Sequence, residues 1–567
     1  MHLYLFLLFD FQAFTNLLTK SEKEEIMSDE NKAVQVTDES QDLKRGIAEW
    51  QVAFIGLGGV IGSCYFLGVG WDIEVMGPGV FWAFLLVGVI VFGLMISYAE
   101  LLVNLPRSGS FIAYTNEFLG PTVSTGFGWA FWFNWVCYVP SEAIAVSAAL
   151  QAITGITSTV AYIAFAVGTM MALTIINLFA VDIFAKIESG LAITKVIIII
   201  LFILVGLGIW VGFWGSPQGE LTAYNITEGF KGAGINFQPE ISVFDNWFPH
   251  GILIISVMMV VVLVTMQGTE IVGLAAAESK NPDVAVPKAC RSVVYRIVAL
   301  YLAPILLVIL IYPTALADDA TPVFAEVARD YGLTPFFYIF CAVVMVAAFS
   351  CGNTGFYGTV RAMYGLSTEG LAPKFLSHLS KNQAPQNAVF FTMAFMWVVL
   401  ITGLISEVTG ALSDLYGSLL CMSGFTGTLA WVGIIASQKR MRTRLKRNGY
   451  DPEKVLKARV KKSIGWVPWF ALIAQIICLI MLAFATPVEK AYIAGMEAKG
   501  LEPDIAVGDT GGGLVIFIIA TSAIVIPMIV YQILNKMGKV GHVATLHGDE
   551  KTFEEAFPPI NGAGDAE

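Results

Sequence analysis

Charge is scarce in this chain of 567 residues: charged residues make up 14% of it, and hydrophobic residues make up 56%. Soluble domains are about 25% charged, so the composition excludes an ordinary soluble protein. Histidine occurs only five times, and no metalloprotease, nucleophile-elbow or phosphate-loop motif is present. We therefore predict a protein that is not an enzyme, and we expect no nucleic-acid partner.

Cysteine is equally sparse. The seven cysteines lie far apart, and none forms the C-x-x-C pair that is typical of metal or redox sites. Isolated cysteines in apolar runs behave as small buried apolar residues. The sequence therefore predicts no metal site and no cofactor.

Long apolar runs, in contrast, recur along most of the chain. Each is long enough for the roughly 20 residues that a membrane-spanning helix needs, and none shows the alternation of a barrel strand. We predict an all-α polytopic membrane protein with about twelve transmembrane helices in the lipid bilayer. The expected spans are 50–75, 78–104, 124–152, 157–180, 190–214, 249–277, 290–314, 334–363, 388–408, 411–437, 465–486 and 511–534.

Lys and Arg gather in the loops after the sixth and tenth spans, whereas loops on the other face are acidic. Because cytoplasmic loops carry the excess of positive charge, we expect both termini in the cytoplasm and the protein in the plasma membrane. The predicted segments are a cytoplasmic N-terminal tail (1–46), a ten-helix transport core (47–437), a basic cytoplasmic loop (438–464), two peripheral transmembrane helices (465–534) and a cytoplasmic C-terminal tail (535–567).

The first residues of the chain are apolar but are interrupted by Asp10. They lack the basic n-region and the small-residue cleavage site of a signal peptide. An acidic tail follows the second methionine, Met27. We expect translation to begin at Met27, with residues 1–26 as an extension that the mature protein lacks.

Two apolar runs carry residues that weaken a helix. The first contains the glycine-rich stretch "GLGGVIGSCYFLGVG", and the sixth contains the polar stretch Gln267–Glu270 in mid-run. These runs open two successive groups of five helices. Paired interruptions at matching positions are the best sequence indication of a transporter binding site. The alternative is that the glycines only permit close packing of helices.

A helix that breaks in mid-membrane leaves free N–H groups at the start of one half and free C=O groups at the end of the other. The N–H groups attract a carboxylate, and the C=O groups attract an ammonium group. An α-amino acid carries both charges at a fixed separation. The two breaks therefore predict a receptor for an amino-acid substrate.

Four blocks follow one another in the expected spans: "GGVIGSCYFLGVG", "GPGVFWAFLLVGVIVFGLMISYAELLVNLPRSGSFIAYTNEFLGP", "MQGTEIVGLAAAESKNPDVAVPKA" and "NTGFYGTVRAMYGLSTEGLAPKFL". Together they resemble the amino acid permease branch of the amino acid–polyamine–organocation superfamily. The resemblance implies a leucine-transporter-type fold, with a five-plus-five inverted repeat, broken helices 1 and 6, and two further helices outside the core.

The resemblance also implies which residues bind the substrate. The N–H groups at the first break, with the Ser63 hydroxyl, are implied to hold the carboxylate, and carbonyl groups at both breaks are implied to hold the ammonium group. The N–H donors are Gly62, Ser63 and Cys64, and the carbonyl acceptors are Val60, Val264 and Gln267.

Gly268 lies within the second break, and Glu270 resembles the glutamate of the family's sixth helix. Glu270 either contacts the substrate or binds freed backbone N–H groups. Two residues depart from the family's pattern: Cys64 replaces a glycine, and Met266 replaces an aromatic residue. These departures leave the size of the substrate open.

Charged residues inside spans are costly and therefore indicate function. Lys195 is expected to couple transport to protons, because some proton-coupled members of the superfamily carry a lysine in the fifth helix; the alternative is that it reaches the headgroups. Glu142 either pairs with a cationic substrate side chain or forms a hydrogen bond between helices. Glu100 and Arg361 are assigned to an ion-pair network of the inner gate, and Asp414 receives no role.

The function we predict is uptake of amino acids by alternating access, driven by a proton gradient with the proton as the coupling ion. An exchanger of amino acids and amines is one alternative. A nutrient-sensing receptor on a transporter fold is another, although the short tails argue against it. The sequence leaves the transported side chain, the mode of coupling and the oligomeric state open.

Overall fold

The structure is a computed structural model. It describes residues 60–107, 109–177, 181–214, 236–237, 241–271, 273, 290, 296–317, 321–380, 384–409, 415–499, 502–508, 510, 513–538 and 550–560, with the backbone alone for 181–189. All of these residues belong to one compact unit, residues 43–567. The predicted N-terminal tail, Met27 and Asp414 lie outside the described residues.

Helices make up the regular structure of the described residues, which contain no strand, and this confirms the all-α class. The longer helices are α5 (Val80–Asn104), α6 (Ser110–Leu119), α7 (Pro121–Thr154), α8 (Thr159–Asn177), α9 (Val181–Trp210), α11 (Ile252–Val264), α14 (Ala303–Ile311), α16 (Thr334–Thr368), α17 (Gln386–Val408), α18 (Leu415–Arg447), α20 (Val467–Met481), α21 (Ala485–Ala498) and α22 (Leu514–Lys536). Shorter ones are α4 (Val69–Met76), α10 (Val243–Trp247), α15 (Val323–Asp330), α19 (Pro452–Val455) and α23 (Phe553–Ala556).

Ten helices in the described part of the chain are long and apolar enough to cross a membrane. The expected count of twelve is therefore not confirmed. The first two expected spans fall within one helical stretch, Cys64–Asn104, because α4 continues into α5 through the 3-10 turn η2 (Gly77–Gly79). The seventh expected span is represented by a shorter apolar helix, Ile297–Ile311.

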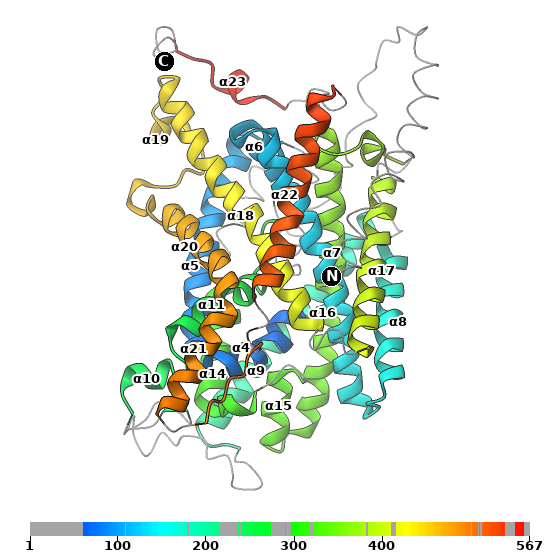
Figure 1. The fold of residues 1–567 in the computed structure, drawn as a ribbon, viewed down its shortest axis with the longest axis vertical. Coiled ribbons are helices and arrows are strands. Elements are labelled where there is room, and N and C mark those ends of the chain that lie inside the picture. Colours follow the sequence, from blue (N-terminus) through cyan, green and yellow to red (C-terminus); the bar gives the residue numbers. More distant parts are fainter. Residues whose placement is uncertain are drawn as a thin grey trace. The chain divides into compact units, whose positions relative to one another are not determined.

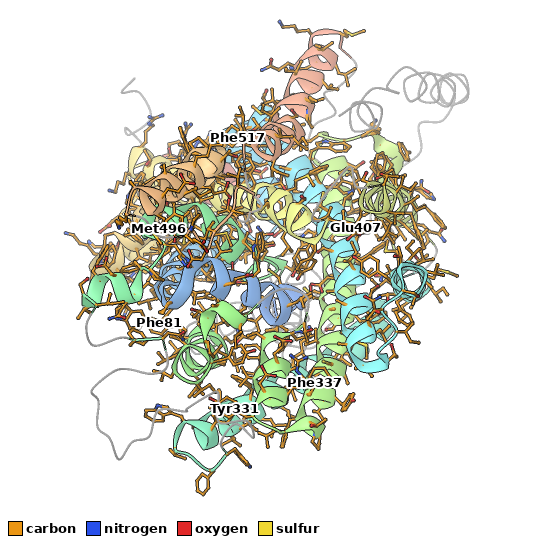
Figure 2. The ribbon with its side chains drawn as sticks, turned by 60° about the horizontal axis from the view of Figure 1, so that its bottom comes forward. Phe81, Tyr331, Phe337, Glu407, Met496 and Phe517 are labelled. Carbon is orange, nitrogen blue, oxygen red and sulfur yellow. The ribbon has the colours of Figure 1, made fainter. Side chains whose placement is uncertain are left out.

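Helix α7 packs against α8, α16, α18 and α22 (Figure 1). In α18, 89% of the apolar window is buried by neighbouring helices, whereas in α22 the share is 11%. Helix α22 therefore turns most of its apolar surface outward. It is held on one side by Phe517 (Figure 2). The Phe517 ring meets the Phe425 ring of α18 edge to face, with 5.4 Å between the ring centres.

Helix α9 has one exposed apolar side and one buried side. Ile197, Ile200 and Leu204 are exposed and recur at a spacing of three or four residues, which places them on one stripe. An exposed apolar stripe of this kind suits the lipid. Phe202 and Lys195 are buried on the opposite side of the helix, where α9 packs against α14 and α16.

Candidate substrate site at two helix breaks

The first break lies at Val60–Gly62, which form a turn and a bend. The chain then enters a π-helical turn, η1 (Cys64–Gly68), and continues into α4. Ser63 precedes this turn without a capping bond from its side chain. Because the first N–H groups of a helix have no intrahelical partner, the break presents free donors in the middle of the expected span. Residues 50–59 of that span lie outside the described residues.

A carboxylate from another helix binds at this break. The Ser63 N–H donates to both oxygens of Glu142, with N–O distances of 3.0 and 3.3 Å. Glu142 is fully buried on α7. The Ser63 hydroxyl forms a second bond, of 3.1 Å, with the Tyr416 hydroxyl of α18. Glu142 thus links α7 to the first break. Its two predicted roles, pairing with a substrate side chain and bonding between helices as a protonated acid, stay predictions.

Gly62 makes room for this carboxylate. A Cβ atom at position 62 would lie 2.3 Å from Oε1 of Glu142, and 2.8 Å from both the Cys351 Sγ and the Tyr138 hydroxyl oxygen. Real Cβ atoms do not approach heavy atoms this closely. Glycine therefore lets these three side-chain ends approach the first break, and a larger residue would force them to move.

The second break follows α11, which ends at Val264, and residues 265–270 form turns. Gly268 has φ +97°, a backbone conformation that residues with a side chain rarely adopt. Its N–H donates to both oxygens of Glu270, at 3.1 and 3.2 Å. The indole N–H of Trp431 donates to Oε2 of Glu270 at 2.8 Å. Glu270 thus binds a freed backbone N–H, and its contact with the substrate stays a prediction.

The carbonyl side of the second break is attached to α18. The Val264 carbonyl oxygen accepts a hydrogen bond of 3.1 Å from the Gln267 N–H. The Gln267 side-chain Nε2 donates to the Gly424 carbonyl oxygen at 3.1 Å. Because a carbonyl oxygen has two lone pairs, Val264 retains one that can accept from an ammonium group.

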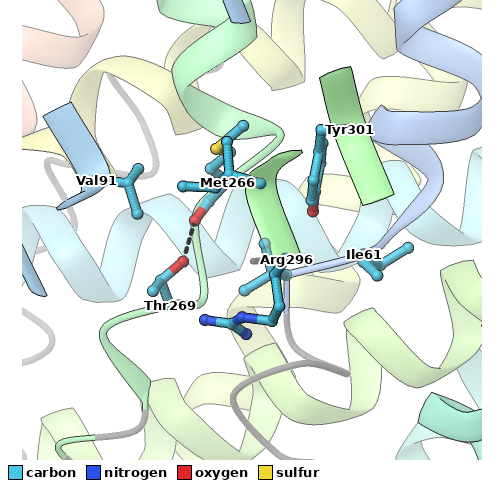
Figure 3. A pocket seen from close by; sticks show the side chains of 8 residues that line it. Ile61, Val91, Met266, Thr269, Arg296 and Tyr301 are labelled. Carbon is cyan, nitrogen blue, oxygen red and sulfur yellow. Dashed lines mark hydrogen bonds between the residues drawn. The ribbon is translucent and has the colours of Figure 1, made fainter. Parts of the chain in front are cut away.

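A small cavity lies between the two breaks (Figure 3). The cavity volume is about 10 Å³, which is roughly the space of one water molecule. An amino acid fits only if the breaks move apart. The lining residues are Val60, Ile61, Val91, Met266, Thr269, Arg296, Ile297 and Tyr301.

Residues 51–498 match the amino acid permease family. The chain belongs to that family. Amino-acid permease RocC of Bacillus subtilis (strain 168) is 30% identical over 410 residues, which cover 72% of this permease and 83% of RocC. The lysine-specific permease LysP of Escherichia coli (strain K12) is 29% identical over 460 residues, which cover 78% and 87% of the two chains. These relatives are transporters, so membership points to an amino acid transporter rather than an enzyme.

This permease is also similar to another relative and to a solved structure. The gamma-aminobutyric acid permease of Bacillus subtilis (strain 168) is 30% identical over 421 residues, 73% of this permease and 83% of the relative. Among solved structures, a crystal structure of a mutant manganese transporter from Eremococcus coleocola covers 88% of this permease and 98% of its own chain, at 14% identity and a TM-score of 0.49.

Lys195 of the permease is fully buried on α9. A lysine that reached the headgroups would expose its ammonium group at the end of the helix, so the burial disagrees with that alternative. The role of Lys195 in proton coupling stays a prediction.

The two residues assigned to the inner gate have separate surroundings. Glu100 is buried on α5 and accepts two bonds of 2.7 Å from the Arg442 guanidinium of α18. The Val460 N–H also donates to it, at 2.7 Å. The Arg361 guanidinium lies over the Tyr357 ring, 3.9 Å from its centre. The structure thus connects Glu100 to the predicted basic loop, and the gating role of both residues stays a prediction.

A second cluster of charges surrounds Arg107. Its guanidinium pairs with Glu117 of α6 at 3.2 Å, with Glu369 at 3.4 Å and with Glu550 at 3.8 Å. Burial raises the pKa of Glu369, although Arg107 opposes the shift. The Phe553 N–H donates to Glu117 at 2.5 Å. The segment 550–560 is therefore bound to α6.

Three residues near the breaks were not among the predicted site residues. Tyr416 contacts Ser63, and Arg296 lines the cavity with its guanidinium (Figure 3). Asp72, in α4, is fully buried. Asp72 and Arg296 both lie inside expected spans, so the rule that charges within spans indicate function would have found them. No sequence signal distinguishes Tyr416 from other tyrosines.

Proposed function

We propose that this permease takes up amino acids across the plasma membrane by alternating access, coupled to protons, with both termini in the cytoplasm. The observation that carries the proposal is the pair of breaks beside one cavity, each with a buried glutamate on a freed N–H group. Such breaks can hold a carboxylate and an ammonium group. The cavity admits an amino acid only after movement, as alternating access requires.

Glu142 supplies a physical route to coupling. Its carboxylate accepts from the Ser63 N–H, the donor that a substrate carboxylate would need. Two carboxylates repel one another at a shared donor. A proton on Glu142 neutralises its carboxylate, so the Ser63 N–H becomes available to the carboxylate of the substrate. When the substrate departs, the proton passes from Glu142 to Lys195 in its neutral amine form, and then to water.

The substrate is found first by a thermal-shift screen of the purified permease against the twenty amino acids and common amines. A ligand that binds only the native state raises the unfolding temperature. We expect a response to one or a few amino acids. A response to amines alone would favour the exchanger, and no response to any amino acid would contradict the proposal.

Coupling is then measured in proteoliposomes with an inward proton gradient and the amino acid found in the screen. We expect Lys195→Ala to lose proton-driven uptake but to keep exchange between preloaded vesicles. The matched control is Ile197→Ala, on the exposed side of the same helix. Undiminished proton-driven uptake by Lys195→Ala would remove the coupling part of the proposal.

A further inference from the structure

Asp72 is a buried carboxylate that the proposed transport mechanism does not use. It lies in α4, nine residues after Ser63, with no exposed surface. Neither of its carboxylate oxygens has a hydrogen-bond partner among the residues that the structure describes. Glu74, two residues further along the same helix, is exposed. The two carboxylates of α4 therefore have opposite environments.

Among the described residues, the elements that α4 packs against carry no Lys or Arg side chain. These elements are η1, η2, α5, α11 and the short turn η5 (Thr314–Leu316). The face of α4 that follows Cys64 and Gly68 turns toward α18, because a Cβ at Gly68 would lie 3.8 Å from the Tyr416 hydroxyl oxygen. The titratable side chains on the elements that α4 packs against are Cys64 and Tyr65 on η1 and Tyr98 and Glu100 on α5, with Glu74 on α4 itself. Helix α18 carries Tyr416 and Cys421 near its start, and its basic residues all lie within its last nine positions, at Lys439, Arg440, Arg442, Arg444, Lys446 and Arg447.

The imidazole nearest to the end of α4 is already engaged. His250 contacts the Val75 carbonyl oxygen through Nδ1 at 2.6 Å and the Asp504 carboxylate through Nε2 at 2.9 Å. Asp504 itself is held in the charged form: burial acts to raise its pKa, but hydrogen bonds from Tyr492 and His250 lower it below the usual range. His250 therefore pairs with Asp504 and does not supply a counter-charge to Asp72.

A carboxylate without donors or a counter-ion is strongly disfavoured in an apolar interior. The free-energy cost of burying the carboxylate falls when the carboxylate binds a cation. A metal ion needs several oxygen ligands, and the described residues contain no group of three His, Cys, Asp or Glu side chains that could hold one. A proton needs only the carboxylate oxygen.

We propose that Asp72 is a proton-binding site on the second half of the first helix. With α4 packed against α11, the proton is covalently bound as the carboxylic acid. When α4 and α11 separate, water reaches Asp72. The O–H bond of the carboxylic acid then breaks and the proton passes to water, leaving a hydrated carboxylate. Closure reverses both steps. This cycle rests on the proposed alternating access, whereas the presence of the proton in the closed form does not.

Infrared spectroscopy of the purified permease at neutral pH tests this directly, because a protonated carboxyl group has its own C=O stretching band. We expect Asp72→Asn to lose one such band that wild type and the matched control Glu74→Gln both retain. Asp72→Leu, whose side chain suits the apolar surroundings, should lose the same band and serves if the asparagine variant does not fold.

An unchanged carboxyl band in folded Asp72→Asn or Asp72→Leu would overturn the proposal. The measurement needs neither substrate nor proton gradient. Failure of proton-driven uptake and absence of a proton on Asp72 are therefore independent results, and each proposal can fall without the other.

Discussion

The two breaks of this permease each pair a backbone N–H with a glutamate, but the two glutamates lie at different distances along the chain from their donors. Both breaks present a backbone N–H in the middle of the bundle, and at both a fully buried glutamate accepts a hydrogen bond from that N–H. At the second break, Glu270 lies two residues from its donor, Gly268. At the first break, Glu142 lies 79 residues from Ser63, on a different helix. The first glutamate joins the break to α7, whereas the second binds within its own segment and also to Trp431 of α18.

The glycines differ in the same way. Gly268 is required by its own backbone, because φ is +97°. Gly62 has no such backbone requirement, and glycine is required there by Glu142, Cys351 and Tyr138 from other helices. The glycine of the second break is thus required by its own backbone, and that of the first break by its neighbours.

The largest difference should appear with Gly62→Ala. The added Cβ would lie 2.3 Å from Oε1 of Glu142, so the carboxylate must leave Ser63. Overpacking of this kind costs about 1–3 kcal/mol, and we expect initial rates of uptake to fall at least about tenfold. Gly168→Ala is the matched control, because a Cβ there meets nothing within 4 Å. Wild-type uptake by Gly62→Ala would mean that the first break is as self-contained as the second.

Replacing each glutamate by glutamine removes the charge of the side chain and keeps its size, so the two substitutions test the role of the charge at each break. We expect Glu142→Gln to flatten the dependence of uptake on external pH, because glutamine takes up no proton, and to slow uptake at acidic pH about tenfold. Glu270→Gln should keep the pH dependence and lose about 1–3 kcal/mol of stability, because one amide oxygen replaces two carboxylate oxygens that serve two donors. The measurements are initial rates across a pH series and thermal unfolding. Equal pH profiles for the two variants would remove the distinction between the breaks.

Trp431→Phe tests the second break alone. It removes the indole N–H that donates to Oε2 of Glu270 at 2.8 Å. A hydrogen bond to a charged group is worth about 1.5–3 kcal/mol, so the thermal unfolding midpoint should fall while the pH profile of uptake stays that of wild type. A flattened pH profile would show that the second break also takes part in coupling.

The sequence predicted both breaks because glycine and polar residues are conspicuous inside apolar runs. It also predicted that Glu270 binds freed N–H groups as one of two alternatives, since a short loop restricts the reach of a side chain. It did not predict which carboxylate meets Ser63, because contacts between residues 79 positions apart depend on how helices pack. The expected count of twelve spans is not confirmed, since η2 continues the helix through Gly77–Gly79 and joins the first two expected spans into one helical stretch.

The smallest expected effect belongs to Tyr416→Phe, which removes the hydroxyl that bonds to the Ser63 hydroxyl at 3.1 Å. A neutral hydrogen bond contributes about 0.5–1.5 kcal/mol, so we expect a severalfold rise in KM for uptake and little change in thermal stability. Ser63→Ala removes this bond and also the hydroxyl that is expected to contact the substrate carboxylate, so it should cost at least as much as Tyr416→Phe. The double variant should cost no more than Ser63→Ala, since Ser63→Ala has already removed the bond to Tyr416. Additive losses in this cycle would mean that the two hydroxyls act separately, and that the first break depends on Glu142 alone.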